Sequence, residues 1–120
     1  MPYFFDTYAL IEITNKNENY RKYFEEEVIT SILNLAELFY GFLKENKGHL
    51  IEEWKNKVRS VISTIDMETI IAAVKFKHEH KGKNFSFIDC LSYSIALKSD
   101  MPFLTGDKEF EGMSNVEFVK

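Results

Sequence analysis

The chain is organised around the stretch Phe85-Ser-Phe-Ile-Asp-Cys-Leu-Ser-Tyr-Ser-Ile-Ala-Leu97. As a helix this stretch is apolar almost all the way round, which is typical of a buried helix. Asp89 is the exception, and a carboxylate near the start of a buried helix costs free energy unless a cation meets it. Because no Lys or Arg is obvious on that face, a metal ion is a candidate counter-charge. The local alternative is an S-x-x-D capping box, in which Asp89 accepts a hydrogen bond from the backbone of Ser86.

The composition is that of an ordinary globular domain. The chain has 120 residues, of which 45% are hydrophobic and 28% charged, enough to bury a core in one domain over residues 1–120. A net charge of −4 argues against binding nucleic acid through bulk charge, although a local basic patch is compatible with it. Cys90 is the single cysteine, which favours a reducing compartment, and no apolar run is long enough to cross a membrane. We therefore expect a soluble, cytoplasmic protein with no membrane partner.

Short apolar runs alternate with helical patterns along the chain. Strands are predicted at residues 3–5, 28–30, 58–65, 103–105 and 116–119. Helices are predicted at residues 8–13, 15–27, 31–44, 50–57, 67–80 and 85–97. Such alternation indicates right-handed βαβ crossovers. The prediction is therefore an α/β fold, a three-layer α/β/α sandwich around a central, mostly parallel five-stranded sheet.

The apolar spacing also predicts which helix faces are buried. The helix at 31–44 is expected to bury one stripe and to leave Glu37 on the opposite, solvated side with Asn34 and Gly41. That stripe consists of Ile32, Leu35, Ala36, Phe39, Phe42 and Leu43. The helix at 67–80, with Asp66 as its N-cap, is expected to bury a face made of Ile70, Ile71, Val74 and His78.

Four acids fall where a parallel sheet would bring them together. Asp6 follows the first predicted strand and Asp107 follows the fourth, while Glu37 and Asp89 lie in or near first helical turns. In open α/β sheets the functional crevice lies beyond the carboxyl ends of the strands. Each acid has an alternative as a helix cap or a solvated surface group, but capping alone explains their shared location less well.

The same positions carry a family resemblance. The segments that carry it are Phe5-Asp-Thr7, Leu35-Ala-Glu-Leu-Phe-Tyr-Gly41, Phe87-Ile-Asp-Cys-Leu-Ser-Tyr-Ser-Ile-Ala96 and Leu104-Thr-Gly-Asp-Lys-Glu-Phe110. In this order they resemble the opening strand and the L-x-E-L-x-x-G, A-D-x-x-I-A-A-x-A and L-T-x-D-x-x-F patterns of the PIN-domain family. The resemblance extends over the whole chain and is strongest to the small stand-alone VapC-type toxins of toxin–antitoxin pairs.

The chain departs from the family pattern at several positions. Ile88 replaces the usual alanine before the acid, Ser92 takes an isoleucine position, and Tyr93 and Ser94 stand where the family has alanines. Gly106 occupies a position that is often Arg, Asn or Asp. None of these changes removes an acid, so they concern helix packing and substrate preference.

The resemblance implies a ribonuclease that depends on Mg²⁺ or Mn²⁺, and the chemistry of the acids agrees with this. Clustered carboxylates repel one another and a phosphodiester, whereas Mg²⁺ binds carboxylate oxygens, keeps several waters and bridges to phosphate. In this interpretation Asp6 and Asp89 are the principal metal ligands. Asp107 binds directly or through water, and Glu37 completes the site or positions the attacking water.

Further residues would support the reaction. Thr7 and Thr105 are candidates for orienting carboxylates, water or phosphate through their hydroxyls. Candidates for contacts with the RNA backbone precede the Asp89 helix, with a solvated helix end as the alternative. They are Lys75, Lys77, Lys81 and Lys83.

The resemblance also implies protein partners, because VapC-type toxins are typically dimers held inactive by an antitoxin. We expect a homodimer and a VapB-like antitoxin for this chain. An aromatic-rich set on the second and third predicted helices is a candidate interface, with burial in the core as the alternative. The set consists of Tyr20, Tyr23, Phe24, Phe39, Tyr40 and Phe42.

Two functions other than a nuclease are compatible with the fold. A non-catalytic PIN-fold module would bind RNA or protein without cutting, but the presence of all four acids speaks against it. A phosphoacceptor receiver domain requires an acidic pair after its first strand, whereas Asp6 lies between Phe5 and Thr7.

Overall fold

A computed structural model of the chain describes residues 2–58, 60–62 and 64–120. The strands are β1 (Phe4–Phe5), β2 (Ile29–Ser31), β3 (Ser60–Ile62), β4 (Phe103–Thr105) and β5 (Val116–Phe118). The α-helices are α1 (Thr7–Thr14), α2 (Ile32–Lys44), α3 (His49–Lys57), α4 (Met67–Glu79) and α5 (Phe87–Lys98). Two 3₁₀ helices, η1 (Glu18–Tyr23) and η2 (Lys108–Phe110), complete the order.

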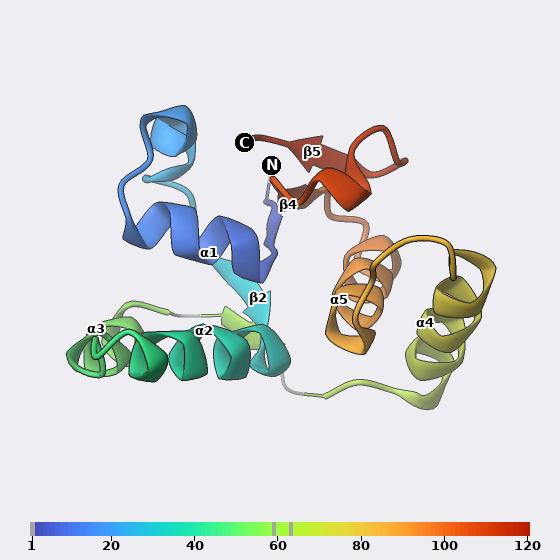
Figure 1. Ribbon diagram of the computed structural model, residues 1–120, viewed down its shortest axis with the longest axis horizontal. Coiled ribbons are helices and arrows are strands. Elements are labelled where there is room, and N and C mark those ends of the chain that lie inside the picture. Colours follow the sequence, from blue (N-terminus) through green and yellow to red (C-terminus); the bar gives the residue numbers. More distant parts are fainter. Residues whose placement is uncertain (1, 59, 63) are drawn as a thin grey trace.

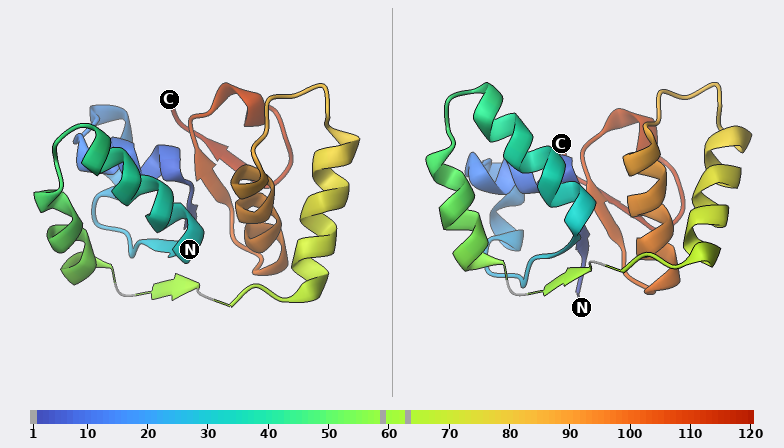
Figure 2. Two further views of the ribbon diagram at one scale, coloured as in Figure 1. Left: turned by 60° about the horizontal axis from the view of Figure 1, so that its bottom comes forward. Right: turned by 90° about the horizontal axis from the view of Figure 1, so that it is seen from below.

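The strands form one parallel sheet in the order β3-β2-β1-β4-β5. Helices α1, α2 and α3 lie on one side of it, and α5 and α4 lie on the other (Figures 1 and 2). This confirms the predicted three-layer α/β fold with a parallel five-stranded sheet. Because the chain covers opposite faces after β1 and before β4, these neighbouring strands form the switch point at which open sheets have their crevice.

The sheet separates two cores, and alternate residues of each central strand face opposite sides. Phe5 and Leu104 pack into the core beneath α1 and α2, whereas Phe4 and Phe103 pack into the core beneath α5. Phe5 pairs with Leu104 in the register of β1 and β4. The next residues along the chain, Asp6 and Thr105, are therefore neighbours at the carboxyl edge.

The predicted buried face of α2 is confirmed at Phe42, and Leu35 and Phe39 pack partly buried against the same core, but it is wrong at its two ends. Ile32 and Leu43 are 49% and 58% exposed, whereas Asn34, Leu38 and Phe42 are buried. The side that carries Asn34 packs against the neighbouring helices because hydrogen bonds satisfy the buried amide, described below. Periodicity alone cannot reveal this, since it counts Asn as a surface residue.

The predicted buried face of α4 is also wrong. Ile70, Ile71 and Val74 are 40%, 41% and 49% exposed, while Thr69 and Ala73 are buried. Helix α4 is the outermost helix and packs mainly on α5, so it buries one narrow face. Asp66 does cap α4 as predicted, because its side chain accepts a hydrogen bond from the backbone of Thr69.

The aromatic set proposed as an interface belongs mostly to the core. Tyr20, Tyr23 and Phe42 are buried, and Phe24 and Phe39 are half-buried against the same core. Tyr40, at 63%, is the strongly exposed member of the set. None of the helices in the described ranges is long and apolar enough to cross a membrane.

Candidate active site

Asp6 is held at the centre of the carboxyl edge by the neighbouring strand. Its backbone N–H donates to the carbonyl of Leu104 at 3.0 Å, and its buried side chain accepts a hydrogen bond from Thr105, with Oγ1 and Oδ2 2.7 Å apart. Asp6 stands at the N-cap position of α1, yet its side chain makes no cap hydrogen bond. Asp6 therefore occupies the predicted N-cap position without capping the helix through its side chain, and Thr105 orients the carboxylate instead.

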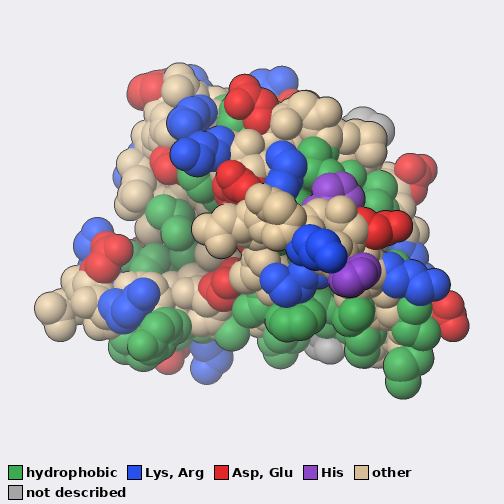
Figure 3. Space-filling model, turned by 45° about the vertical axis from the view of Figure 1, so that its right-hand side comes forward, with side chains coloured by type: hydrophobic (Ala, Val, Ile, Leu, Met, Phe, Trp, Pro, Cys, Tyr) green, Lys and Arg blue, Asp and Glu red, His purple; other side chains and the backbone are tan. Residues whose placement is uncertain are grey.

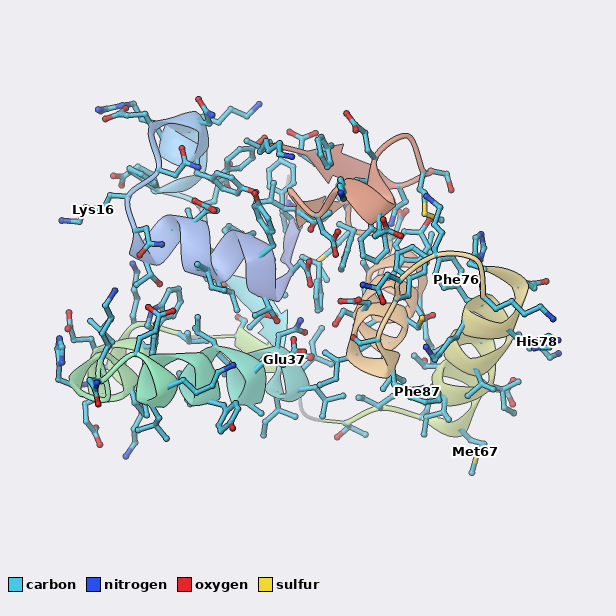
Figure 4. The ribbon with its side chains drawn as sticks, in the orientation of Figure 1. Lys16, Glu37, Met67, Phe76, His78 and Phe87 are labelled. Atoms are coloured by element: carbon cyan, nitrogen blue, oxygen red, sulfur yellow. The ribbon has the colours of Figure 1, made fainter. Side chains whose placement is uncertain are left out.

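Glu37 is fixed from the first turn of α1. The Thr7 hydroxyl donates to Glu37, with Oγ1 and Oε1 2.6 Å apart, and Thr7 accepts a hydrogen bond from Asn34 Nδ2 at 3.0 Å. Glu37 lies on the side of α2 that faces α5 (Figure 4) and is half-buried. The prediction of a solvated Glu37 face is therefore wrong.

Asp89 does form the capping box. Ser86 donates its backbone N–H to Asp89 Oδ2 at 2.8 Å, and the backbone of Asp89 donates back to Ser86 Oγ at 3.0 Å. Lys77 is close enough for its charge to lower the pKa of Asp89 in part. Lys77 belongs to α4 and forms no ion pair with Asp89 among the described residues; its Nζ donates to the carbonyl of Phe85 instead.

Asp107 follows β4 and also has a local partner. Its Oδ1 accepts a hydrogen bond from the backbone of Glu109 at 3.0 Å and so caps η2. Its own backbone N–H donates to Thr105 Oγ1 at 3.1 Å. Thr105 therefore connects Asp6 and Asp107.

The electrostatics show that the four acids share one region. Burial, with repulsion from Asp89 and Glu37, raises the pKa of Asp6 to about 7, although the hydrogen bond from Thr105 opposes the rise. Burial and the charge of Asp107 raise the pKa of Asp89. Burial and the charge of Asp89 raise the pKa of Glu37. Acids that follow β1 and β4 thus repel acids on α2 and α5 at the carboxyl edge of the sheet, and this region is called the acid crevice below.

The donor set fits a hard divalent cation, although the side chains do not already enclose one. Among residues 2–58, 60–62 and 64–120, no three carboxylate, imidazole or thiolate groups stand together as a metal site. Hydrogen bonds from Thr105, Thr7, Ser86 and Glu109 already occupy one oxygen of each acid. The second oxygen of each acid remains as a ligand of the kind that Mg²⁺ and Mn²⁺ prefer.

The four lysines predicted to contact RNA differ in their surroundings: two are hydrogen-bonded to backbone carbonyls and two are exposed. Lys77 Nζ donates to the carbonyl of Phe85 at 2.6 Å, and Lys83 Nζ donates to the carbonyl of Glu109 at 2.8 Å. Lys75 and Lys81 are exposed. A hollow on this side is lined by Val74, Lys77, His78, Lys81, Lys83 and Phe87. Figure 3 shows basic and histidine side chains gathered above a band of hydrophobic ones on this face.

Sequence reasoning missed two buried polar residues behind the acids. Asn34 Oδ1 accepts hydrogen bonds from Ser31 Oγ at 2.5 Å and Ser92 Oγ at 3.0 Å. Asn34 and Ser92 are fully buried, and so is their common neighbour Ser31. Ser92 in an isoleucine position was the available signal, since a polar residue there requires a polar partner.

Acids gathered at the switch point of a parallel sheet are typical of the α/β domains that bind ligands at the strand ends. The model of one family, the PIN domain, matches residues 3–116. The chain belongs to the PIN-domain family.

Solved structures share the fold over nearly the whole chain. VapC20 of Mycobacterium tuberculosis, a toxin that cleaves the sarcin–ricin loop, has a TM-score of 0.80 and 16% identity and covers 98% of each chain. A toxin–antitoxin complex of Klebsiella pneumoniae has a TM-score of 0.76 at 18% identity, covering 96% of this chain and 95% of that one. DNA-bound VapBC of Salmonella typhimurium has a TM-score of 0.74 at 22% identity, covering 98% and 96%. No curated protein sequence matches the chain.

Proposed function

We propose that this chain is an endoribonuclease dependent on Mg²⁺ or Mn²⁺, and the toxin of a VapBC-type toxin–antitoxin pair in the cytoplasm. One observation carries the proposal: Asp6 is buried at the switch point of the sheet and repelled by Asp89 and Glu37. A fold that only needed a helix cap there gains nothing from burying a carboxylate beside two others. A divalent cation turns this unfavourable arrangement into a binding site.

The residues of the chain then have separate roles. Asp6 and Asp89, with Asp107 directly or through water, would hold the cation. When bound, that ion would acidify a water and neutralise charge on the phosphate. Thr105 keeps Asp6 and Asp107 in register. Glu37, whose pKa is raised by burial and by Asp89, would orient the attacking water and accept its proton.

RNA would reach the crevice along its basic side. Lys75 and Lys81 are exposed and would contact backbone phosphates directly. Lys77 and Lys83 already donate to backbone carbonyls, so their contribution would be the positive potential they add near Asp89. The net charge of −4 makes this local potential the main attraction for phosphate.

Protein partners are proposed from an exposed apolar surface. The outer face of α4, defined by Met67, Ile70, Ile71 and Val74, is 40–68% exposed, and Phe87 beside it is 59% exposed. Contiguous apolar exposure of this kind marks a protein interface. We infer that this outer α4 face pairs two copies of the chain, and that a VapB-like antitoxin inhibits the dimer. The toxin–antitoxin complexes among the similar structures support the second partner.

The experiment combines Mn²⁺ titration by calorimetry with cleavage of a mixed RNA pool. Wild type should bind Mn²⁺ and cut RNA, and Asp89→Asn should do neither. Asp66→Asn is the matched control, because Asp66 also caps a helix through its side chain but lies outside the crevice. Loss of metal binding in Asp89→Asn alone separates a ligand from a cap.

A non-catalytic PIN-fold interaction module is the second candidate function. It is favoured by the local hydrogen bonds that occupy Asp89 and Asp107 as caps. Unchanged Mn²⁺ binding in Asp89→Asn, together with no metal-dependent cutting by wild type, would establish this candidate and overturn the nuclease.

A further inference from the structure

Gly106 is a position where the chain has no room for a side chain. A Cβ built there would lie 2.3 Å from Cε1 and 2.8 Å from Cζ of Tyr8, and 2.3 Å from the carbonyl oxygen of Val119. The Tyr8 ring therefore rests directly on the backbone of residue 106.

The ring stands at the rim of the acid crevice. Tyr8 lies two residues after Asp6 in the first turn of α1, and Gly106 immediately precedes Asp107. Burial, then the charges of Glu12 and Asp107, raise the pKa of the Tyr8 phenol. The phenol is thus close to two carboxylates, and the ring is partly exposed.

Three buried tyrosines stabilise the fold through their hydroxyl groups, and Tyr8 differs from them. Tyr20 donates its hydroxyl to the carbonyl of Val119 at 2.5 Å, Tyr93 donates to the carbonyl of Ser114 at 2.5 Å, and Tyr23 donates to Glu117. These three rings are buried. Within the described part of the chain, the Tyr8 hydroxyl makes no such bond. The Tyr8 ring packs against the core beneath α1 and Gly106, which fixes its position, while its hydroxyl is not used to hold the fold together.

We propose that Tyr8 is a stacking platform for one nucleobase of the RNA, next to the phosphate that is cut. This inference rests on the proposed function and adds a base-binding subsite to it. The carboxylates near the phenol disfavour a phosphate at this point but not the uncharged face of a base. An aromatic ring held in place by Gly106 is preorganised for stacking, which is tolerant of base identity.

The test uses short RNA oligonucleotides that wild type cuts, each with one base removed at a different position. Binding is measured by fluorescence anisotropy with the full chain carrying Asp89→Asn, so that the RNA stays intact. When residue 8 is Tyr, or Phe in the Tyr8→Phe variant, removal of one particular base from the RNA should weaken binding about tenfold. Tyr8→Leu should bind the intact RNA about tenfold more weakly and be insensitive to removal of that base.

The controls separate the subsite from the function it depends on. Tyr40→Leu, which removes an exposed ring from the outer side of α2, should keep the sensitivity to base removal, and Tyr8→Phe shows that the fold tolerates a change at residue 8. If wild type cuts RNA but Tyr8→Leu is as sensitive to base removal as its parent, the stacking platform is wrong and the nuclease stands. If Tyr8→Leu changes only inhibition by an antitoxin, the ring is a protein contact and the proposal fails. If wild type neither binds nor cuts RNA, both proposals fail.

Discussion

Asn34 donates a hydrogen bond from Nδ2 to the hydroxyl of Thr7, 3.0 Å away. This bond sets the direction of the next one, because a Thr7 oxygen that accepts from Asn34 has its proton free to donate to Glu37. On its other side, the Asn34 carbonyl oxygen accepts from Ser31 and Ser92. A buried chain of polar groups therefore connects α5 to the acid on α2.

Breaking this chain should destabilise the protein through unsatisfied groups. We expect Asn34→Leu to lower the free energy of unfolding by about 2–3 kcal/mol, since the buried Ser31 hydroxyl loses the acceptor of its proton and Thr7 and Ser92 each lose one hydrogen bond. Urea unfolding measures the change, and Asn56→Leu on the exposed surface of α3 is the control. A loss no greater than that of the control would show that the network contributes nothing.

The pKa of Asp6 predicts a stability that depends on pH in the absence of metal. With a folded pKa of about 7 against 3.8 for the free group, folding favours the protonated acid. The neutral Asp6 side chain therefore contributes fully to the free energy of unfolding below pH 4. This contribution is lost as the pH rises toward 7, and it amounts to at most about 4 kcal/mol.

Asp6→Asn should therefore unfold at a higher temperature than wild type at pH 8 in EDTA, with a gain of about 2 kcal/mol in the free energy of unfolding. The gain should vanish at pH 4, where the wild-type acid is already neutral. Thermal unfolding of both proteins across this range tests the sign. A gain independent of pH would mean that repulsion in the acid crevice is not its cause.

Divalent cations should offset the destabilisation of the folded state that repulsion between the charged acids causes. At about ten times its dissociation constant, Mg²⁺ or Mn²⁺ should stabilise wild type by about 1.4 kcal/mol at pH 8, and EDTA should remove the effect. Asp107→Asn should reduce this stabilisation, whereas Asp66→Asn should retain it. Equal stabilisation of both variants would place the cation outside the crevice.

The outer α4 face makes a prediction about assembly. If it pairs two copies, Ile71→Glu should convert the dimer to a monomer in sedimentation velocity, because a carboxylate cannot be buried unpaired between apolar surfaces. Leu43→Glu, at a comparably exposed apolar residue on α2, should leave the dimer intact. The same oligomeric state in wild type and Ile71→Glu would exclude this face as the dimer interface.

Sequence patterns predicted the strands and their connectivity well because a short apolar run marks most of them. In β1, for example, Phe4 and Phe5 point into opposite cores. The same patterns failed for the buried face of α4 and for the two ends of that of α2. Burial there depends on which neighbours cover the helix, and a buried Asn34 needs the distant residues Thr7 and Ser92 as partners. Spacing also could not separate cap from site at Asp89, because the capping box and the shared acid crevice both exist.

The two glycines of the family-like segments should respond in opposite ways to alanine. At Gly106 a Cβ would meet the Tyr8 ring and the Val119 backbone, so Gly106→Ala should cost about 2 kcal/mol of stability through overpacking. At Gly41, inside α2, nothing lies within 4 Å of the added Cβ, and Gly41→Ala should stabilise the helix by about 0.5–1 kcal/mol. Urea unfolding of both variants provides the comparison. If Gly106→Ala is as stable as wild type, then both the Tyr8 ring and the Val119 backbone move away from residue 106 at little cost, and the ring is not held in place there.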